Sequence, residues 1–266
     1  MLICPVLYII NMAHYKGLFR LKLFSWFVAI NSFLGKSTNP AMFQELSRIS
    51  NADAIEFFIS ELPENGIFID IGANLGVITE EILKVKRCNA ILFEPIPEYA
   101  NHIRIKFRGN DNVVIENVAL GDSTGNFSLY KDKYNLGWNT LLREKTTGEM
   151  DSIDIQMITF DDYAIQKNLN RIDLIKIDVE GAEYRVLKGM KQTLKRLKNK
   201  PIIYCEIGWG KDSHPYWEEE VEMFEWLFDH GYKRFDYNSI CRTTDVILCP
   251  EGTTLMSSLK DAPDHN

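Results

Sequence analysis

One short stretch constrains the fold of this chain more than any other, an apolar run that ends in an acid and a glycine-rich turn. Residues 67–71 are apolar except for Asp70 and are bounded by glycines, which is typical of a strand buried on both faces of a sheet. Apolar residues then recur at helical spacing, at Ile78, Ile82 and Val85. A strand, an acid at its end, a glycine turn and a helix predict the first ligand-binding unit of an open α/β sheet.

Acids at the ends of the first two predicted strands indicate the kind of ligand. Asp70 ends the first strand, and Glu94 ends the second at about the separation at which a ribose-binding acid follows a first strand. Glu94 can accept hydrogen bonds from two ribose hydroxyls. The turn at 72–76 does not match the G-x-G-x-x-G dinucleotide fingerprint. S-adenosylmethionine fits better, because its ribose, carboxylate, ammonium and sulfonium each find a suitable partner here.

Four motifs occur in one order: DIGANLG at 70–76, FEP at 93–95, NVALGD at 117–122 and KIDVEGAE at 176–183. Together they resemble the FkbM-type family of S-adenosylmethionine-dependent methyltransferases, over roughly residues 50–210. The resemblance implies a class I methyltransferase fold, that is, a Rossmann-like, seven-stranded and mostly parallel sheet with helices on both faces. It also implies O-methylation of a sugar, glycan or secondary-metabolite hydroxyl.

Length and composition fit this expectation. The 266 residues carry a net charge of −7, which argues against a nucleic-acid partner, since such proteins carry basic patches. Five cysteines are scattered without C-x-x-C spacing, so we expect reduced thiols in a cytoplasmic protein and no metal site.

The first 40 residues differ from the rest and are expected to form a helical extension. They hold four basic residues and no acid, and no apolar run reaches the ~18 residues that a membrane span needs. Residues 1–36 could lie on a membrane surface, or they could pack on the catalytic domain or form a homo-oligomer contact. We expect the methyltransferase domain over 41–250 and a frayed tail over 251–266.

Hydrophobic periodicity places the remaining elements. Helices are expected over 41–62, 97–108, 160–169, 186–197 and 217–228. Strands are expected over 112–118, 126–131, 153–158, 171–178, 201–207, 232–235 and 246–249. Residues 132–151 are expected to form a long polar loop, of a length that is usually functional or disordered.

Acids after later strands provide the catalytic candidates. Asp178 ends the central strand and is the predicted general base, because an acceptor hydroxyl must lose a proton. It could instead hold the methionyl ammonium. Glu180 in the following turn and His214 in a later loop are the other candidates. The alternative for any of these acids is to cap the next helix.

The binding residues follow from the strand ends and from the resemblance. The predicted cofactor-binding set is Asp70, Gly72, Ala73, Asn74, Gly76, Glu94, Pro95, Asn117, Val118, Ala119 and Asp178. In the family the turn after the third strand lies along the adenine, and Asn117 is either an adenine contact or a turn-forming side chain. The predicted acceptor-binding set is Trp138, Asn139, Thr140, Glu183 and Glu206.

Trp138 offers a flat apolar face to a sugar, although it could also fold back onto the domain.

Three other functions compete with O-methylation. An N-methyltransferase of nucleic acids often carries an Asn/Asp-Pro-Pro-aromatic turn, where this chain reads DVEG at 178–181. The N-terminal segment suggests a second alternative, a catalytically weak protein of the same fold that binds a membrane surface. A nicotinamide-dependent oxidoreductase is disfavoured by the missing third glycine.

Overall fold

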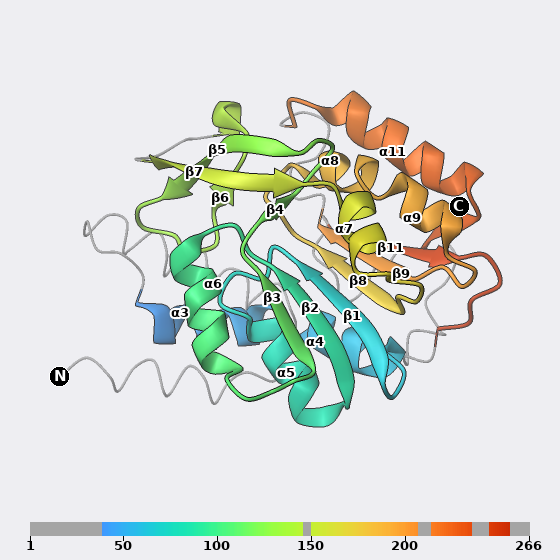
Figure 1. Ribbon diagram of the computed structural model, residues 1–266, viewed down its shortest axis with the longest axis horizontal. Coiled ribbons are helices and arrows are strands. Elements are labelled where there is room, and N and C mark those ends of the chain that lie inside the picture. The colour runs from blue at the N-terminus through green and yellow to red at the C-terminus, as the bar shows by residue number, and fades with distance from the viewer. Residues whose placement is uncertain (1–38, 146–149, 207–213, 236–244, 256–266) are drawn as a thin grey trace.

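The computed structural model describes residues 39–145, 150–206, 214–235 and 245–255. Its central strands are β1 (Gly66–Ile71), β2 (Cys88–Phe93), β3 (Val113–Glu116), β8 (Leu174–Ile177), β9 (Ile202–Glu206), β10 (Tyr232–Phe235) and β11 (Asp245–Pro250). They form one sheet in the order β10-β11-β9-β8-β1-β2-β3 (Figure 1). The strands from β3 to β9 are parallel, and β11 runs antiparallel to both of its neighbours. The predicted seven-stranded, mostly parallel sheet is confirmed.

The sheet is covered on both faces because its strands are apolar on both. Successive side chains of a strand point to opposite faces, so Ile69 and Phe68 of β1 enter different cores, both 0% exposed. Ile69 packs in a core with helices α7 (Phe160–Gln166), α8 (Glu183–Lys188), α9 (Lys191–Arg196) and α11 (Trp217–Asp229). Phe68 packs in a core with α4 (Ala52–Glu61), α5 (Val77–Val85) and α6 (Pro97–Lys106).

A second sheet lies beyond the carboxyl end of β3 (Figure 1). It contains β4 (Ala119–Leu120), β7 (Met150–Ile158), β5 (Gly125–Asp132) and β6 (Asn139–Thr140), in that order. The half-buried strands predicted over 126–131 and 153–158 are confirmed, and they pair antiparallel. The structureless loop predicted over 132–151 is wrong for its described part, because β6 pairs with β5 and a 3₁₀ turn, η1, spans Arg143–Lys145.

Helix α3 (Pro40–Ser50) begins within one residue of the predicted start at 41, and the Asn39 side-chain oxygen accepts from the Ala41 amide at 2.9 Å. The single helix predicted over 41–62 is wrong. It is divided at Asn51, whose side-chain amide donates to the Ser47 carbonyl at 2.9 Å. As a result, α4 lies on the sheet, while α3 reaches the edge where the parallel strands end (Figure 1).

The helix predicted over 186–197 is also divided, into α8 and α9 at Gly189 and Met190. A Cβ on Gly189 would lie 1.9 Å from the carbonyl oxygen of Gly121, in the segment that follows β4. Glycine is needed where two backbones approach this closely. The break therefore docks the helical layer against the second sheet.

The predicted N-terminal extension lies outside the described residues, and so does most of the predicted tail. Among the residues that are described, every helix is too short or too polar to span a bilayer. The thiols of Cys88 and Cys205 are free and buried.

The contact between Gly189 and Gly121 predicts a large cost for one added methyl group. We expect Gly189→Ala to lower the free energy of unfolding by about 2–3 kcal/mol, because a backbone carbonyl must move to admit the Cβ. Gly125→Ala is the matched control, since its Cβ would meet only the Phe127 ring at an ordinary 3.4 Å. Urea denaturation measures both variants, and equal stabilities would contradict the close contact.

Candidate active site

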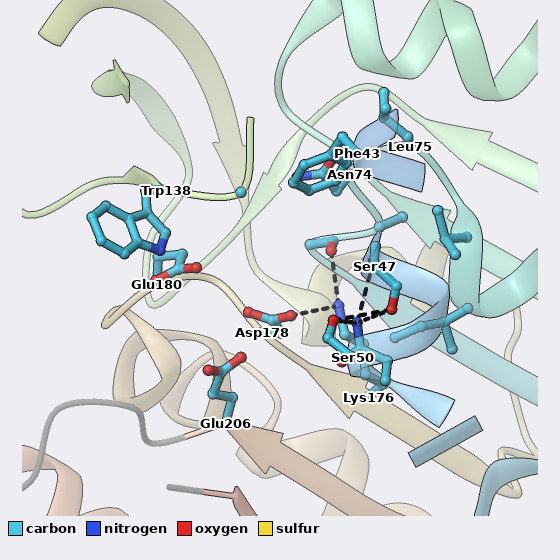
Figure 2. Close-up of a pocket in the computed structure, with 16 residues that line it drawn as sticks. Phe43, Ser47, Ser50, Asn74, Leu75, Trp138, Lys176, Asp178, Glu180 and Glu206 are labelled. Atoms are coloured by element: carbon cyan, nitrogen blue, oxygen red, sulfur yellow. Dashed lines mark hydrogen bonds and ion pairs between the residues drawn. The ribbon is translucent and has the colours of Figure 1, made fainter. Parts of the chain in front are cut away.

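Two adjoining cavities lie at the carboxyl ends of β1, β2 and β8, where open α/β sheets bind ligands. The larger, of about 400 Å³, is lined by residues of α3, the glycine turn, β8 and the loop before β6 (Figure 2). The smaller, of about 60 Å³, lies on the side of β2 and β4. They share Gly72, Asn74, Gly137, Asp178 and Glu180. The shared residues mark the junction between two compartments of one site.

The glycine turn touches the end of β8 through its backbone. Gly72 has φ +75°, and a Cβ there would lie 1.9 Å from the carbonyl oxygen of Asp178. Both the conformation and the space therefore require glycine. Gly76 also has a positive φ, +68°, and precedes α5 without lining either cavity.

Lys176 anchors this junction, and it was not predicted as a site residue. Its side chain is 5% exposed, and its ammonium donates to the Gly72 carbonyl at 2.9 Å. The ammonium also pairs with Asp178 at 3.2 Å and with Asp70 at 3.5 Å. Burial acts to lower the pKa of Lys176, but the Asp178 and Asp70 carboxylates outweigh it and raise the pKa above its usual value. Lys176 therefore stays charged and joins the β1 turn to β8.

Glu94 is positioned by backbone amides in the smaller cavity. Its two carboxylate oxygens accept from the amides of Asn74 and Ile96, each at 2.8 Å. Burial raises the pKa of Glu94 to about 8, against the lowering effect of these hydrogen bonds and of Lys176. Each oxygen keeps a lone pair that can accept from a ligand hydroxyl.

Asn74 connects the glycine turn to the loop before β6. It has φ +51°, and its side-chain NH₂ donates to the Leu136 carbonyl at 2.8 Å. Its side-chain oxygen is buried and accepts no hydrogen bond from the described part of the chain. Because Asn74 lines both cavities, this oxygen is a ready acceptor for a ligand ammonium. The described residues therefore fit an aminoacyl group bound at the turn.

Three carboxylates and an indole line the larger cavity. Asp178 and Glu180 follow β8, Glu206 ends β9, and Trp138 precedes β6 with 52% of its surface exposed. Figure 2 shows these four side chains around the cavity, with a dashed line from Asp178 to Lys176. The structure thus places Asp178, Glu180, Glu206 and Trp138 together, as their predicted roles require.

The other predicted residues of the smaller cavity are Pro95, Val118, Ala119 and Asn139, whereas Ala73 lines the larger one. Asn117 lines neither, and its side-chain amide donates to the carbonyls of Glu94 and Pro95 at 2.8 and 2.9 Å. These bonds correspond to the turn-forming alternative for Asn117.

Asp70 lies behind the site and not in it. It is 1% exposed and accepts from the Thr79 hydroxyl at 2.6 Å. It shares the strand face of Phe68, which packs against α5, so the pleat directs it to the α5 face of the sheet. Asp70 contacts neither cavity, and it acts on them through Lys176.

Thr140, Glu183 and His214 also lie outside both cavities. The Thr140 hydroxyl donates to the Glu180 carbonyl at 2.7 Å. A Glu183 oxygen accepts from the amides of Val179 and Gly181 at 3.0 and 3.1 Å. These interactions fix the turn after β8, which carries Glu180 at φ +56°.

Glu183, His214 and Glu220 form a buried cluster behind that turn. One ligand atom from each lies within 4.8 Å of the others, a spacing that a divalent cation could bridge. However, Glu183 accepts two backbone amides, Glu220 accepts the Tyr184 amide at 3.1 Å, and His214 accepts the Tyr216 amide at 3.0 Å. Burial raises the pKa of Glu183 to about 7. These contacts indicate that the cluster supports the turn structurally.

No residue of α3 was predicted as a site residue. Phe43, Ser47, Ser50 and Asn51 all line the larger cavity. Their position depends on the helix break at Asn51, which periodicity does not reveal. Lys176 did leave a signal, since a lysine within an apolar strand requires a buried partner.

A family model and several known methyltransferases match the sequence of this chain. A model of the methyltransferase FkbM domain matches residues 70–234. The hexuronic acid methyltransferase AglP of Haloferax volcanii is 27% identical over 60% of this chain and 63% of its own length. The 2-O-methyltransferase NoeI of Sinorhizobium fredii is 26% identical over 53% of this chain and 62% of its own length. The chain thus spans less than two thirds of either relative.

A solved structure of the methyltransferase PaMTH1 of Podospora anserina, bound to S-adenosylhomocysteine, covers 80% of this chain and 82% of its own. Its TM-score is 0.45 and its sequence identity is 14%.

The order of the strands is that of a class I methyltransferase fold. The match to the methyltransferase family gives S-adenosylmethionine as the cofactor. The chain belongs to the FkbM methyltransferase domain family. The predicted resemblance is confirmed.

The pKa of Glu94 gives cofactor binding a pH dependence. In its predicted role Glu94 would accept from ribose hydroxyls, which favour its ionised form, so binding would lower a pKa that is about 8 in the free protein. We therefore expect binding to release a proton below pH 8, and affinity for S-adenosylhomocysteine to rise about tenfold between pH 6.5 and 8. Isothermal titration in buffers of different ionisation enthalpy measures the proton release.

Glu94→Gln should bind more weakly, with an affinity that no longer changes with pH. Glu98→Gln is the control, because Glu98 is an exposed acid at the start of the next helix. A wild-type affinity that stays constant between pH 6.5 and 8 would contradict the ribose role of Glu94.

Proposed function

We propose that the protein transfers a methyl group from S-adenosylmethionine to a hydroxyl of a sugar, a glycan or a secondary metabolite. The observation that carries the proposal is the position of Asp178 and Glu180, which line both compartments where these meet. Transfer requires donor and acceptor to approach from opposite sides of one junction. The names of the two relatives, a hexuronic acid methyltransferase and a 2-O-methyltransferase, support methyl transfer to a sugar or to an oxygen atom.

The residues that line the smaller compartment suit contacts to a nucleoside. Glu94 would accept the ribose hydroxyls, while Pro95, Ile96 and Val118 offer apolar contacts to the adenine. The turn at 72–76 would follow the methionyl part, with the Asn74 side-chain oxygen accepting from the ammonium. When bound, the cofactor supplies an electrophilic methyl group on a positively charged sulfur.

The larger compartment suits the acceptor. Trp138 presents an apolar face to a sugar ring, and Glu206 can accept from its hydroxyls. Asp178 is the proposed general base, since its carboxylate reaches the junction and is held there by Lys176 at 3.2 Å. Asp178 takes the hydroxyl proton as the oxygen gains the methyl group and the sulfur loses it.

The proposal also includes roles for four further residues, Glu180, Glu183, Thr140 and His214. Glu180 reaches the cavity, whereas the other three position its turn from behind.

The domain limits are proposed as 41–250, with an extension over 1–40 and a tail over 251–266. Membrane contact through residues 1–36 would be measured by liposome flotation of the full chain and of a form lacking them.

Asp178→Asn separates catalysis from binding. We expect kcat to fall by about 10²- to 10⁴-fold, the usual contribution of a general base, while affinity for S-adenosylhomocysteine changes by less than about threefold. Asp111→Asn is the control, because Asp111 is exposed and lies outside both cavities. The measurement is radiolabelled methyl transfer to a hydroxyl-bearing panel, with the product identified by NMR as a methyl ether. An N-methyl product, or an unchanged kcat, would contradict the proposal.

A further inference from the structure

One wall of the larger cavity is polar and comes from the break between α3 and α4. Ser47, Ser50 and Asn51 line the larger cavity, and none of the three lines the smaller one. In the proposed function the larger compartment holds the acceptor and the smaller one holds the nucleoside. These three side chains therefore meet the acceptor, although none of them belongs to the predicted acceptor-binding set.

Hydrogen bonds within this wall leave one donor and one acceptor available. The Asn51 side-chain NH₂ donates to the Ser47 carbonyl at 2.9 Å and to the Ser47 hydroxyl oxygen at 3.2 Å. Among the described residues, no group donates to the side-chain oxygen of Asn51, and none accepts the hydroxyl proton of Ser47. Ser50 differs, because its hydroxyl donates to the Ser47 carbonyl at 3.1 Å. Ser47 and Asn51 thus present a donor and an acceptor next to each other.

A neighbouring donor and acceptor match one kind of ligand group. A hydroxyl donates one hydrogen bond and also accepts, so it can accept from Ser47 and donate to Asn51 at once. A carboxylate only accepts and an ammonium only donates, so either would leave one of the two groups unused. The wall is therefore suited to a hydroxyl.

Contacts with the rest of the domain hold this wall in place. The Arg48 guanidinium of α3 pairs with Glu81 of α5 at 2.7 Å. The Lys106 ammonium of α6 donates to the Gln44 side chain of α3 at 3.1 Å. A wall that is fixed before binding loses little conformational entropy when a ligand arrives. The donor and the acceptor are therefore positioned in advance.

The aromatic side chain of the cavity lies opposite this wall. Figure 2 shows Trp138 on one side of Asp178, and Ser47 and Ser50 on the other. All four residues line the larger cavity. A ring that spans the cavity would contact Trp138 with its apolar face, Asp178 with the reacting hydroxyl and α3 with a further hydroxyl.

We infer that Ser47 and Asn51 bind a second hydroxyl of the acceptor, one that is not methylated, and thereby determine which acceptors react. This role rests on the proposed function and specifies how its acceptor is held. A site that hydrogen-bonds a substrate hydroxyl rejects the analogue without it, because the polar groups of the site are then left unpaired.

The experiment compares acceptors that differ by one hydroxyl. The full chain is assayed with radiolabelled S-adenosylmethionine and the methyl glycosides of glucose, galactose and mannose. The glycoside that is methylated is then replaced by each of its monodeoxy derivatives. Besides the derivative that lacks the reacting hydroxyl, we expect one other to lower kcat/KM by at least about tenfold.

Ser47→Ala removes the proposed donor. It should lower kcat/KM for the parent glycoside by about three- to tenfold, the effect of one neutral hydrogen bond. For the poorly methylated deoxy derivative, variant and wild type should agree within about twofold, since the hydroxyl that Ser47 binds is already missing. Affinity for S-adenosylhomocysteine should not change. Ser60→Ala is the matched control, because the Ser60 hydroxyl donates to the Phe57 carbonyl within α4, outside both cavities.

Three outcomes would overturn the inference. The first is an equal loss for Ser47→Ala with the parent and the deoxy acceptors, and the second is a weaker affinity of this variant for S-adenosylhomocysteine, which would place α3 at the cofactor. The third is no transfer to any of the glycosides by a protein that binds S-adenosylhomocysteine. A protein that binds no S-adenosylhomocysteine would instead contradict the proposed function.

Discussion

The site depends on one buried ammonium. Lys176 lies within an apolar strand, and desolvating its charge is costly unless that charge is paired. Three oxygens meet it, from the Gly72 carbonyl, Asp70 and Asp178. Two of them belong to β1 and its turn and one to the end of β8, so the ammonium joins the cofactor turn to the proposed base. Removing one partner of a buried pair typically costs about 3–5 kcal/mol, so this junction is expected to be rigid.

Two carboxylates at neighbouring strand ends have different environments. Glu94 is buried and receives two backbone amides, and its pKa is raised to about 8. Asp178 is about one third exposed and stands beside Lys176. In the proposed function, Glu94 binds hydroxyls by hydrogen bonding and Asp178 is the general base. Both side chains carry a carboxyl group, so the difference between them comes from their burial and their hydrogen-bond and ion-pair partners.

Local pattern was enough to predict the sheet, the acids and the glycine turn. Each depends on neighbours in sequence: apolar runs at 67–71 and 174–177, and acids directly after strands. The helix break at Gly189 could not be predicted in this way, because its cause is the carbonyl of Gly121. The same holds for Asn51 and the part of α3 that reaches the cavity.

The placement of Asp70 was within reach of the sequence. It alternates with Ile69 and Ile71, so the pleat of β1 directs it to the α5 face, opposite Lys176 in register. Strand parity therefore predicts a cross-strand ion pair for Asp70 and a ligand contact for Glu94, which lies beyond its strand.

A crystal structure with S-adenosylhomocysteine bound would test the central claim most directly. The account predicts ribose hydroxyls within hydrogen-bond distance of Glu94, the ammonium at the Asn74 side-chain oxygen, and the sulfur facing Asp178 across the junction. A nucleoside bound away from β2, or a sulfur turned away from Asp178 and the larger cavity, would contradict it.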